Sequence, residues 1–318
     1  MPKPFERALE LAERGRGTTH PNPVVGAVVV AGDEVVGEGW HERAGSPHAE
    51  LVALEAASER TRGATLYVTL EPCAHYGRTP PCVDAIVAAG IARVVVGAPD
   101  PNPKTDGQGF ARLRQSGVDV ELLDGEPARR ARRQNEAWRT WIAAGRPFVT
   151  YKAAVTLDGR VVVPESRWVT GEESRRRVHE VRAASDAVAV GTGTVRADAP
   201  RLDARGVEAG RQPRRLAFGT GPLPEGSELE LVSGPLDETL KQLAAEGVQS
   251  LLLEGGPTLA SSFLREGLVA KLLLFVAPTL AGSGPRWVGE LGAALPLAGL
   301  EAERVGDDLL LTGYIREP

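Results

Sequence analysis

Residues 47–54 read Pro-His-Ala-Glu-Leu-Val-Ala-Leu and contain the only His-x-Glu triplet of the chain, His48-Ala49-Glu50. The proline and the helical spacing after it predict a helix that begins here, with His48 and Glu50 in its first turn and facing one pocket. An imidazole ligand beside a carboxylate suits zinc chemistry. The triplet alone is weak evidence, because a chain with five histidines can contain it by chance.

Both cysteines of the chain follow this triplet. Cys73 comes after an expected strand, and Cys82 opens an expected helix, whose free N–H groups favour a thiolate. A catalytic zinc site needs three protein ligands and one open position. We therefore predict that His48, Cys73 and Cys82 bind zinc.

Glu50 is then the predicted acid–base residue. Zinc lowers the pKa of its bound water, and a carboxylate that does not ligate the metal moves that proton to a ring nitrogen and then to the leaving amine. The predicted reaction is deamination of a pyrimidine-like base.

Two other interpretations of the cysteines stay open at this point. They could be buried small hydrophobic residues. Alternatively, the zinc could be structural with His75 as a fourth ligand, which would leave Glu50 without a role.

Composition narrows the class of protein. The chain has 318 residues, 42% of them hydrophobic and 25% charged, which is typical of a soluble globular protein with two domains. It has no apolar run long enough for a membrane span, and its start lacks a signal-peptide pattern. Two cysteines and a net charge of −5 favour a cytoplasmic enzyme of small molecules, without nucleic acid or membrane partners.

The first half reads as an α/β domain on a mixed sheet. We expect helices at 5–14, 49–57, 82–89, 110–115 and 127–144, a hairpin of strands 24–30 and 34–39, and strands at 65–70, 93–97 and 118–122. The stretch 127–144 contains five arginines, which favour a solvated helix face over a nucleic-acid patch. Gly145-Arg146-Pro147 then predicts a boundary between domains 1–145 and 146–318.

The second half is also read as α/β. We expect strands at 148–155, 161–163, 187–190, 215–218, 250–254, 272–277 and 308–312, and helices at 172–184, 236–246 and 258–266. It has no G-x-G-x-x-G fingerprint after a strand. Two strand–glycine–helix junctions, at 191–194 and 254–259, instead favour a dinucleotide lying across strand ends.

The pattern His-Ala-Glu, Pro-Cys and a second cysteine resembles the cytidine-deaminase-like superfamily, although eight residues separate Cys73 from Cys82 instead of two. That insert (residues 74–81), with Thr19-His20-Pro21-Asn22-Pro23 and Asp100-Pro101-Asn102-Pro103, is similar to the RibD family of riboflavin biosynthesis. The resemblance covers nearly the whole chain. It implies a cytidine-deaminase-like domain followed by a dihydrofolate-reductase-like domain.

The resemblance also implies functions and site residues. The first domain would deaminate 2,5-diamino-6-(5-phosphoribosylamino)pyrimidin-4-one, and the second would reduce the ribosyl group to ribityl with NADPH. Residues expected to bind NADPH are Ala154, Trp168, Thr194, Asp198, Thr220, Gly256, Pro257, Thr258, Leu259, Ala260, Ser261 and Ser262. Residues expected to contact substrate are Asn22 and His75 in the first domain, and Lys152, Ser166, Arg182, Leu202, Arg205 and Glu254 in the second.

Three rival functions remain to be separated from this one. A nucleic-acid-editing deaminase predicts a basic face around the zinc pocket and salt-dependent binding. A zinc-stabilised binding protein predicts that chelation unfolds the first domain. The third rival keeps the deaminase beside an inactive reductase half. We also expect a homo-oligomer.

Overall fold

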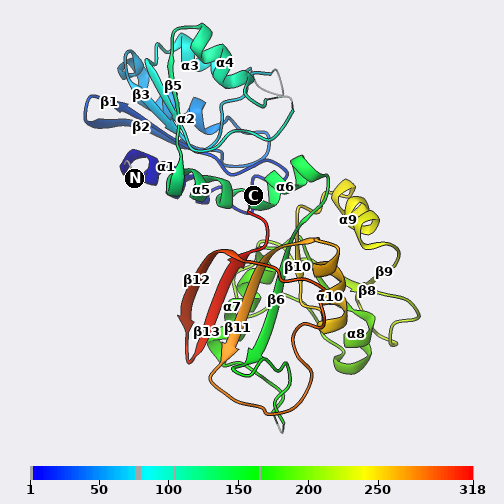
Figure 1. The fold of residues 1–318 in the computed structure, drawn as a ribbon. Coiled ribbons are helices and arrows are strands. Elements are labelled where there is room, and N and C mark those ends of the chain that lie inside the picture. Colours follow the sequence, from blue (N-terminus) through cyan, green and yellow to red (C-terminus); the bar gives the residue numbers. More distant parts are fainter. Residues whose placement is uncertain (1–2, 76–79, 104, 165, 318) are drawn as a thin grey trace. The chain divides into compact units, whose positions relative to one another are not determined.

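The computed structural model describes residues 3–75, 80–103, 105–164 and 166–317. The chain divides into two compact units, one ending at Ala144 and one spanning Gly145–Glu317 (Figure 1). Gly145 lies at the break with φ of 61°, a left-handed conformation that glycine adopts without strain. Residues 76–79 of the insert noted above lie outside the described residues.

The first unit is a five-stranded sheet with helices on both faces. Its strands are β1 (Gly26–Ala31), β2 (Glu34–Trp40), β3 (Thr65–Val68), β4 (Arg93–Val96) and β5 (Asp119–Leu122), and its helices are α1 (Lys3–Glu13), α2 (Ala49–Ala57), the 3₁₀ turn η1 (Ser58–Thr61), α3 (Cys82–Ala88), α4 (Gln108–Gln115), α5 (Gly125–Gln134) and α6 (Glu136–Ala144). The strand order is β2-β1-β3-β4-β5. β1 is antiparallel to both neighbours, and β3, β4 and β5 are parallel, which confirms the predicted mixed sheet.

Glycines let two helices approach this sheet closely. A Cβ on Gly26 would lie 2.0 Å from the Ala8 carbonyl oxygen of α1, and one on Gly39 would lie 2.5 Å from the Ala49 carbonyl oxygen of α2. α1 and α2 therefore cover opposite faces. The close contact with α2 fixes the start of the helix that carries His48 and Glu50.

The second unit is an eight-stranded sheet in the order β12-β13-β11-β6-β10-β7-β8-β9. Its strands are β6 (Phe148–Thr156), β7 (Ala187–Gly191), β8 (Arg214–Phe218), β9 (Glu230–Val232), β10 (Ser250–Leu253), β11 (Val269–Ala277), β12 (Ala298–Val305) and β13 (Asp308–Tyr314). The run from β11 to β9 is parallel, while β13 and β12 are antiparallel additions at one edge.

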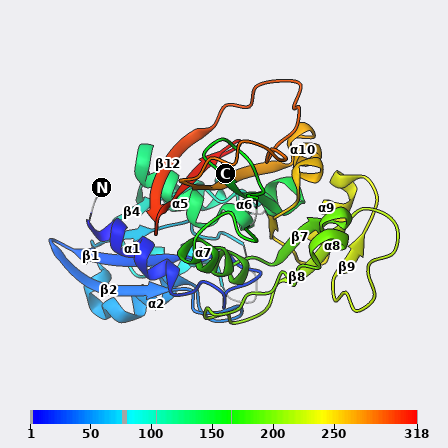
Figure 2. The same cartoon turned by 90° about the horizontal axis from the view of Figure 1, so that it is seen from below.

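Helices cover both faces of this second sheet. They are α7 (Glu172–Ala183), α8 (Thr192–Asp198), α9 (Leu236–Ala245) and α10 (Pro257–Arg265) (Figure 2). Leu240 of α9 and Phe263 of α10 belong to the main apolar core with Leu251 of β10, whereas Val178 of α7 and Val195 of α8 pack in separate clusters. The α/β class is confirmed for both units.

Two expected elements are wrong. The strand expected at 161–163 is only an isolated bridge between Val163 and Ser166, because a turn and Pro164 interrupt the backbone. The helix expected at 127–144 is two helices broken at Asn135, whose side chain bonds to the main chain of Val24.

Two strands were missed, β9 and β12. β9 has only three residues, too few for a pattern, and the alternation of Ala298, Leu300 and Ala302 with glycine and glutamate in β12, an exposed edge strand, was overlooked. Among the described residues, no helix is long and apolar enough to cross a membrane.

Candidate functional site

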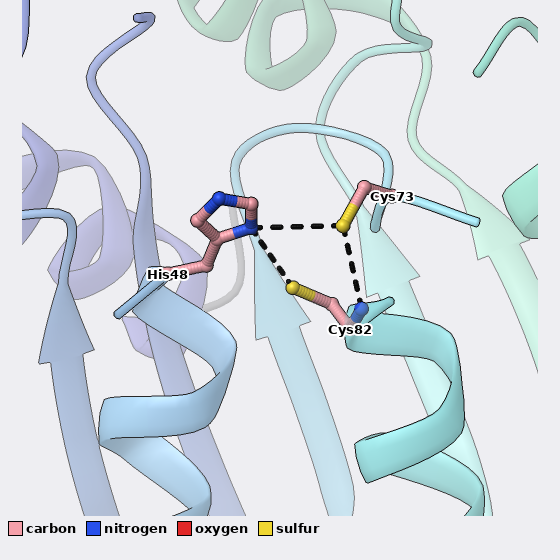
Figure 3. Close-up of side chains that lie close together, drawn as sticks. All are labelled: His48, Cys73 and Cys82. Atoms are coloured by element: carbon pink, nitrogen blue, oxygen red, sulfur yellow. Dashed lines mark hydrogen bonds between the residues drawn. The ribbon is translucent and has the colours of Figure 1, made fainter. Parts of the chain in front are cut away.

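Three side chains predicted as zinc ligands converge in the first unit. His48 Nδ1 lies 3.1 Å from the Sγ of Cys82 and 3.6 Å from the Sγ of Cys73, and all three ligand atoms lie within 4.8 Å of one another. Figure 3 shows both sulfurs facing the same ring nitrogen. These residues are brought together from the start of α2, the loop after β3 and the start of α3.

The arrangement fits a tetrahedral zinc ion. Bonds of about 2.0 Å to nitrogen and 2.3 Å to sulfur place these atoms about 3.5 Å apart; the N–S distance to Cys73 is 3.6 Å and that to Cys82 is 3.1 Å, somewhat shorter. Within the described part of the chain, this ligand group contains three residues and does not include His75. One position is thus left for a non-protein ligand, as in catalytic zinc sites.

Backbone bonds hold the Cys73 loop against the start of α3. The Cys82 amide donates to the Cys73 sulfur at 3.3 Å, and the Val83 amide donates to the Cys73 carbonyl at 3.3 Å. The first amide of α3 therefore stabilises a thiolate at Cys73. This corrects the sequence-based expectation that the helix N–H groups would favour a thiolate at Cys82.

The pKa values follow the same geometry. Hydrogen bonds from Cys82 and His48 lower the pKa of Cys73 to about 4. The pKa of the Cys82 thiol is raised by its hydrogen bond with Cys73 and by burial. The hydrogen bond with Cys73 raises the pKa of His48 to about 9. Without metal, the site therefore holds one thiolate, one thiol and one imidazolium near neutral pH.

Glu71, two residues before Cys73, anchors the same loop from the other side. Its buried carboxylate accepts hydrogen bonds from the amides of Asp100, Gly107, Gly109 and Phe110, at 3.0–3.4 Å. Three of these amides belong to the start of α4, where N–H groups otherwise lack partners. Glu71 thus ties the Cys73 loop to α4 and is a structural carboxylate.

Glu50 is separate from the ligand group and is 3% exposed. Burial raises the pKa of its carboxyl, against the opposing effect of the His48 charge. Glu50 also lines the pocket beside His48 and Cys73. It is therefore a buried carboxylate placed next to the metal position, as the proton-transfer role requires.

The ligands open into a pocket of about 490 Å³. Of the residues predicted to hold the pyrimidine, both Asn22 and His75 line it. Lining residues that sequence reasoning did not assign are His41, Asp100, Asn102, Trp138, Trp141 and Ile142. The last three lie on α6 at helical spacing, so an apolar stripe within the arginine-rich stretch was the signal that could have revealed them.

Asn22 is oriented by His41. His41 Nδ1 lies 3.1 Å from the Pro47 carbonyl oxygen, so this nitrogen carries the proton and donates it. Its Nε2 then accepts from the Asn22 side-chain nitrogen at 3.1 Å. Burial lowers the pKa of His41, which keeps the ring neutral. No hydrogen bond to the Asn22 side-chain oxygen is found among the described residues, so this oxygen can accept one from a ligand.

In the second unit, Glu254 joins two of the predicted substrate residues. Its carboxylate accepts two hydrogen bonds from Arg182, at 2.6 and 3.0 Å, and lies 3.6 Å from the Lys152 ammonium. Burial alone would raise the pKa of Glu254, but Lys152 and Arg182 lower it overall. Lys152 lies on β6 and Glu254 directly follows β10, and these two strands are neighbours in the sheet.

Several residues expected to bind cofactor lie at the ends of adjacent parallel strands. Gly256, the N-cap of α10 after β10, lies near Thr194 of α8, which follows β7. After β8, the Thr220 carbonyl accepts a hydrogen bond from Arg196 of α8 at 2.9 Å. Gly219 there has φ of 140° and directly faces Thr192.

The other residues predicted to bind cofactor or substrate differ in their exposure to solvent. Leu202, Ala260 and Ser261 are buried, and the Ser261 hydroxyl already accepts from the Gly289 amide, so a ligand would meet these residues through the main chain. Ser166, Trp168, Asp198 and Arg205 are exposed, and Arg205 pairs with Asp203. Ala154 lies on β6, two residues beyond Lys152.

Two family models match different parts of the chain. Residues 3–98 match the family model of the cytidine and deoxycytidylate deaminase zinc-binding region, and residues 147–311 match that of the RibD C-terminal domain. The riboflavin biosynthesis protein RibD of Aquifex aeolicus is 40% identical over 342 residues, covering 96% of this chain and 95% of that protein. The Escherichia coli protein of the same name is 40% identical over 356 residues, covering 96% of each.

Solved structures agree over the full length. Acinetobacter baumannii RibD has a TM-score of 0.85 at 37% identity and covers 98% of this chain and 97% of its own. A Thermotoga maritima diaminohydroxyphosphoribosylaminopyrimidine deaminase/5-amino-6-(5-phosphoribosylamino)uracil reductase has a TM-score of 0.82 at 33% identity, with the same coverage.

The protonation of the ligands predicts that zinc binding releases protons. At pH 7, His48 and Cys82 must each lose one, while Cys73 is already a thiolate, so we expect at least two protons per zinc, and ionisation of a zinc-bound water would add to them. The contribution of His48 should disappear above pH 9, where its ring is neutral. A pH indicator in weakly buffered, metal-free protein measures the release. His75→Ala should leave it unchanged, and release of no proton at pH 7 would contradict the assigned ligands.

Proposed function

Because the chain belongs to the RibD family of riboflavin biosynthesis, in which a deaminase is joined to a reductase, we propose that residues 1–145 form its deaminase domain and residues 146–318 its reductase domain. The chain is a bifunctional enzyme, a hydrolase and an oxidoreductase. The reaction sequence is deamination of the diaminohydroxyphosphoribosylaminopyrimidine, followed by reduction of the resulting 5-amino-6-(5-phosphoribosylamino)uracil.

In the deaminase, His48, Cys73 and Cys82 would hold zinc, and the observation that carries this role is their convergence beside Glu50. When bound, zinc supplies the Lewis acidity that makes water nucleophilic near neutral pH. Glu50 would take a proton from the attacking water as the water oxygen bonds to the ring carbon that bears the amine. It delivers protons to the ring nitrogen and then to the amine, which leaves as ammonia. One water is consumed and one ammonia released.

The raised pKa of Glu50 suits this double role, because a carboxyl that must both accept and donate a proton works best when its pKa is near the working pH. Asn22 would accept a hydrogen bond from the base through its free side-chain oxygen. His75, whose Nδ1 lies 3.4 Å from the Thr105 hydroxyl, would face the same pocket.

In the reductase, the ends of β10, β7 and β8 would hold a nicotinamide cofactor, and NADPH is the form we propose. Parallel strands carry their ligands at their carboxyl ends, and the N-terminus of α10 at Gly256 suits a phosphate. When bound, NADPH supplies a hydride for C1 of the ribosyl group. Lys152, held beside Glu254, is better placed than the exposed Asp198 to assist proton transfer there.

Arg182 and Arg205 would contact the substrate, whose phosphate a guanidinium can bind with two hydrogen bonds. Arg182 is already engaged by Glu254 and the Asp203 carbonyl, so Arg205 is the more accessible of the two. We also propose a cytoplasmic homo-oligomer. The low cysteine content supports the location.

Glu50→Gln should retain zinc but lose ammonia release by at least about a hundredfold, because the amide cannot shuttle protons. The same variant should still oxidise NADPH when given the deaminated uracil intermediate. Glu55→Gln, on the exposed side of the same helix, is the matched control. Loss of zinc in Glu50→Gln would show that the carboxylate is a ligand. Failure of wild-type protein to oxidise NADPH would leave only the deaminase active.

Arg205→Ala should raise the KM of the reductase for its phosphorylated substrate by about tenfold, because a hydrogen bond to a charged group contributes about 1.5–3 kcal/mol. The KM for NADPH should not change. Arg201→Ala removes the other arginine that pairs with Asp203 and is the control. Equal effects of the two substitutions in steady-state kinetics would mean that Asp203, and not a substrate phosphate, is the relevant partner.

A further inference from the structure

Asn135 breaks the helical stretch between α5 and α6 and is 6% exposed. Its side-chain oxygen accepts from the Val24 amide at 2.9 Å, and its side-chain nitrogen donates to the Val24 carbonyl at 2.8 Å. One side chain thus satisfies both main-chain groups of a residue 111 positions away in the sequence. A buried main-chain group left without a partner is costly, so this pairing fixes Val24 in place.

Val24 is buried and lies two residues after Asn22, which lines the deaminase pocket together with the neighbours of Val24, Pro23 and Val25. From Asn22 the contacts continue to His41 and from His41 to the Pro47 carbonyl, next to the metal ligand His48. The His41 amide also donates to the Val25 carbonyl at 2.9 Å. Asn135 therefore fixes the backbone at Val24, and the chain on either side of Val24 carries the hydrogen bonds of Asn22 and Val25 to His41, which orient the Asn22 amide.

The helices that supply Asn135 lie outside residues 3–98, the region that matches the zinc-binding deaminase model. The same segment places Trp138, Trp141 and Ile142 on the pocket wall. The zinc site and its proton-transfer carboxylate belong to the matched region. The wall formed by α6 is therefore an addition to the pocket from outside the matched region.

We propose that Asn135 is a positioning residue of the deaminase reaction, which acts by holding the Pro23-Val24 segment so that Asn22 presents its side-chain oxygen to the pyrimidine. This inference rests on the deaminase function proposed above. It assigns to the α5–α6 junction a role in base recognition that metal binding does not need.

The first test uses two substitutions in the full-length zinc enzyme. Asn135→Ala removes both hydrogen bonds, and the nearly isosteric Asn135→Asp removes the donor while keeping the volume. Both should lower kcat/KM for ammonia release by about tenfold or more, mainly through KM, with zinc content and reductase activity unchanged. Gln134→Ala, whose amide bonds instead to Leu9 and Glu13 of α1, is the control and should change kcat/KM by less than about twofold.

The second test asks whether Asn135 acts through Asn22. If it does, Asn135→Ala should have little further effect in an Asn22→Ala background, since residues that work through one another are not additive. A multiplicative loss in the double variant, or a loss that only follows loss of zinc or of folded protein, would overturn the proposal. So would unchanged kcat/KM in both Asn135 variants. Absence of ammonia release from the wild-type enzyme would instead refute the deaminase function itself.

Discussion

The first unit depends on keeping three ligand atoms within 4.8 Å, although His48, Cys73 and Cys82 come from separate segments of the chain. The His48 ring nitrogen and the Cys82 backbone N–H both face the Cys73 sulfur. The close packing of Gly39 on α2 and the amides held by Glu71 fix the elements around it. These contacts fix the segments that carry the three ligand atoms.

In the second unit, a buried carboxylate positions two basic side chains. Its parallel strands bring three loops to one edge of the sheet, and Glu254 holds Lys152 and Arg182 together there at little exposure. Removing one member of such a cluster leaves an unpaired buried charge. The cluster thus fixes the orientation of Lys152 and Arg182, which we propose to contact the substrate.

Local signals in the sequence predicted much of this. The helix at 49–57 and the hairpin before it were predicted because apolar spacing, turn residues and Pro47 act within a few residues of one another. The helix break at Asn135 could not be predicted in this way, because Val24, to which the Asn135 side chain bonds, is 111 residues away. The role of His41 depends likewise on Pro47 and Asn22, which only the fold brings to its ring. The prediction that the start of α3 favours a thiolate at Cys82 is wrong, because the Cys82 amide donates its hydrogen bond to the sulfur of Cys73.

The central claim is that three protein ligands leave one coordination position for a reacting water. X-ray absorption at the zinc edge of the loaded, substrate-free protein tests it directly. We expect two sulfurs at about 2.3 Å and two nitrogen or oxygen atoms at about 2.0–2.1 Å, of which one is an imidazole nitrogen and one is an oxygen that exchanges with solvent. A shell with a second imidazole, or one without two sulfurs, would contradict it.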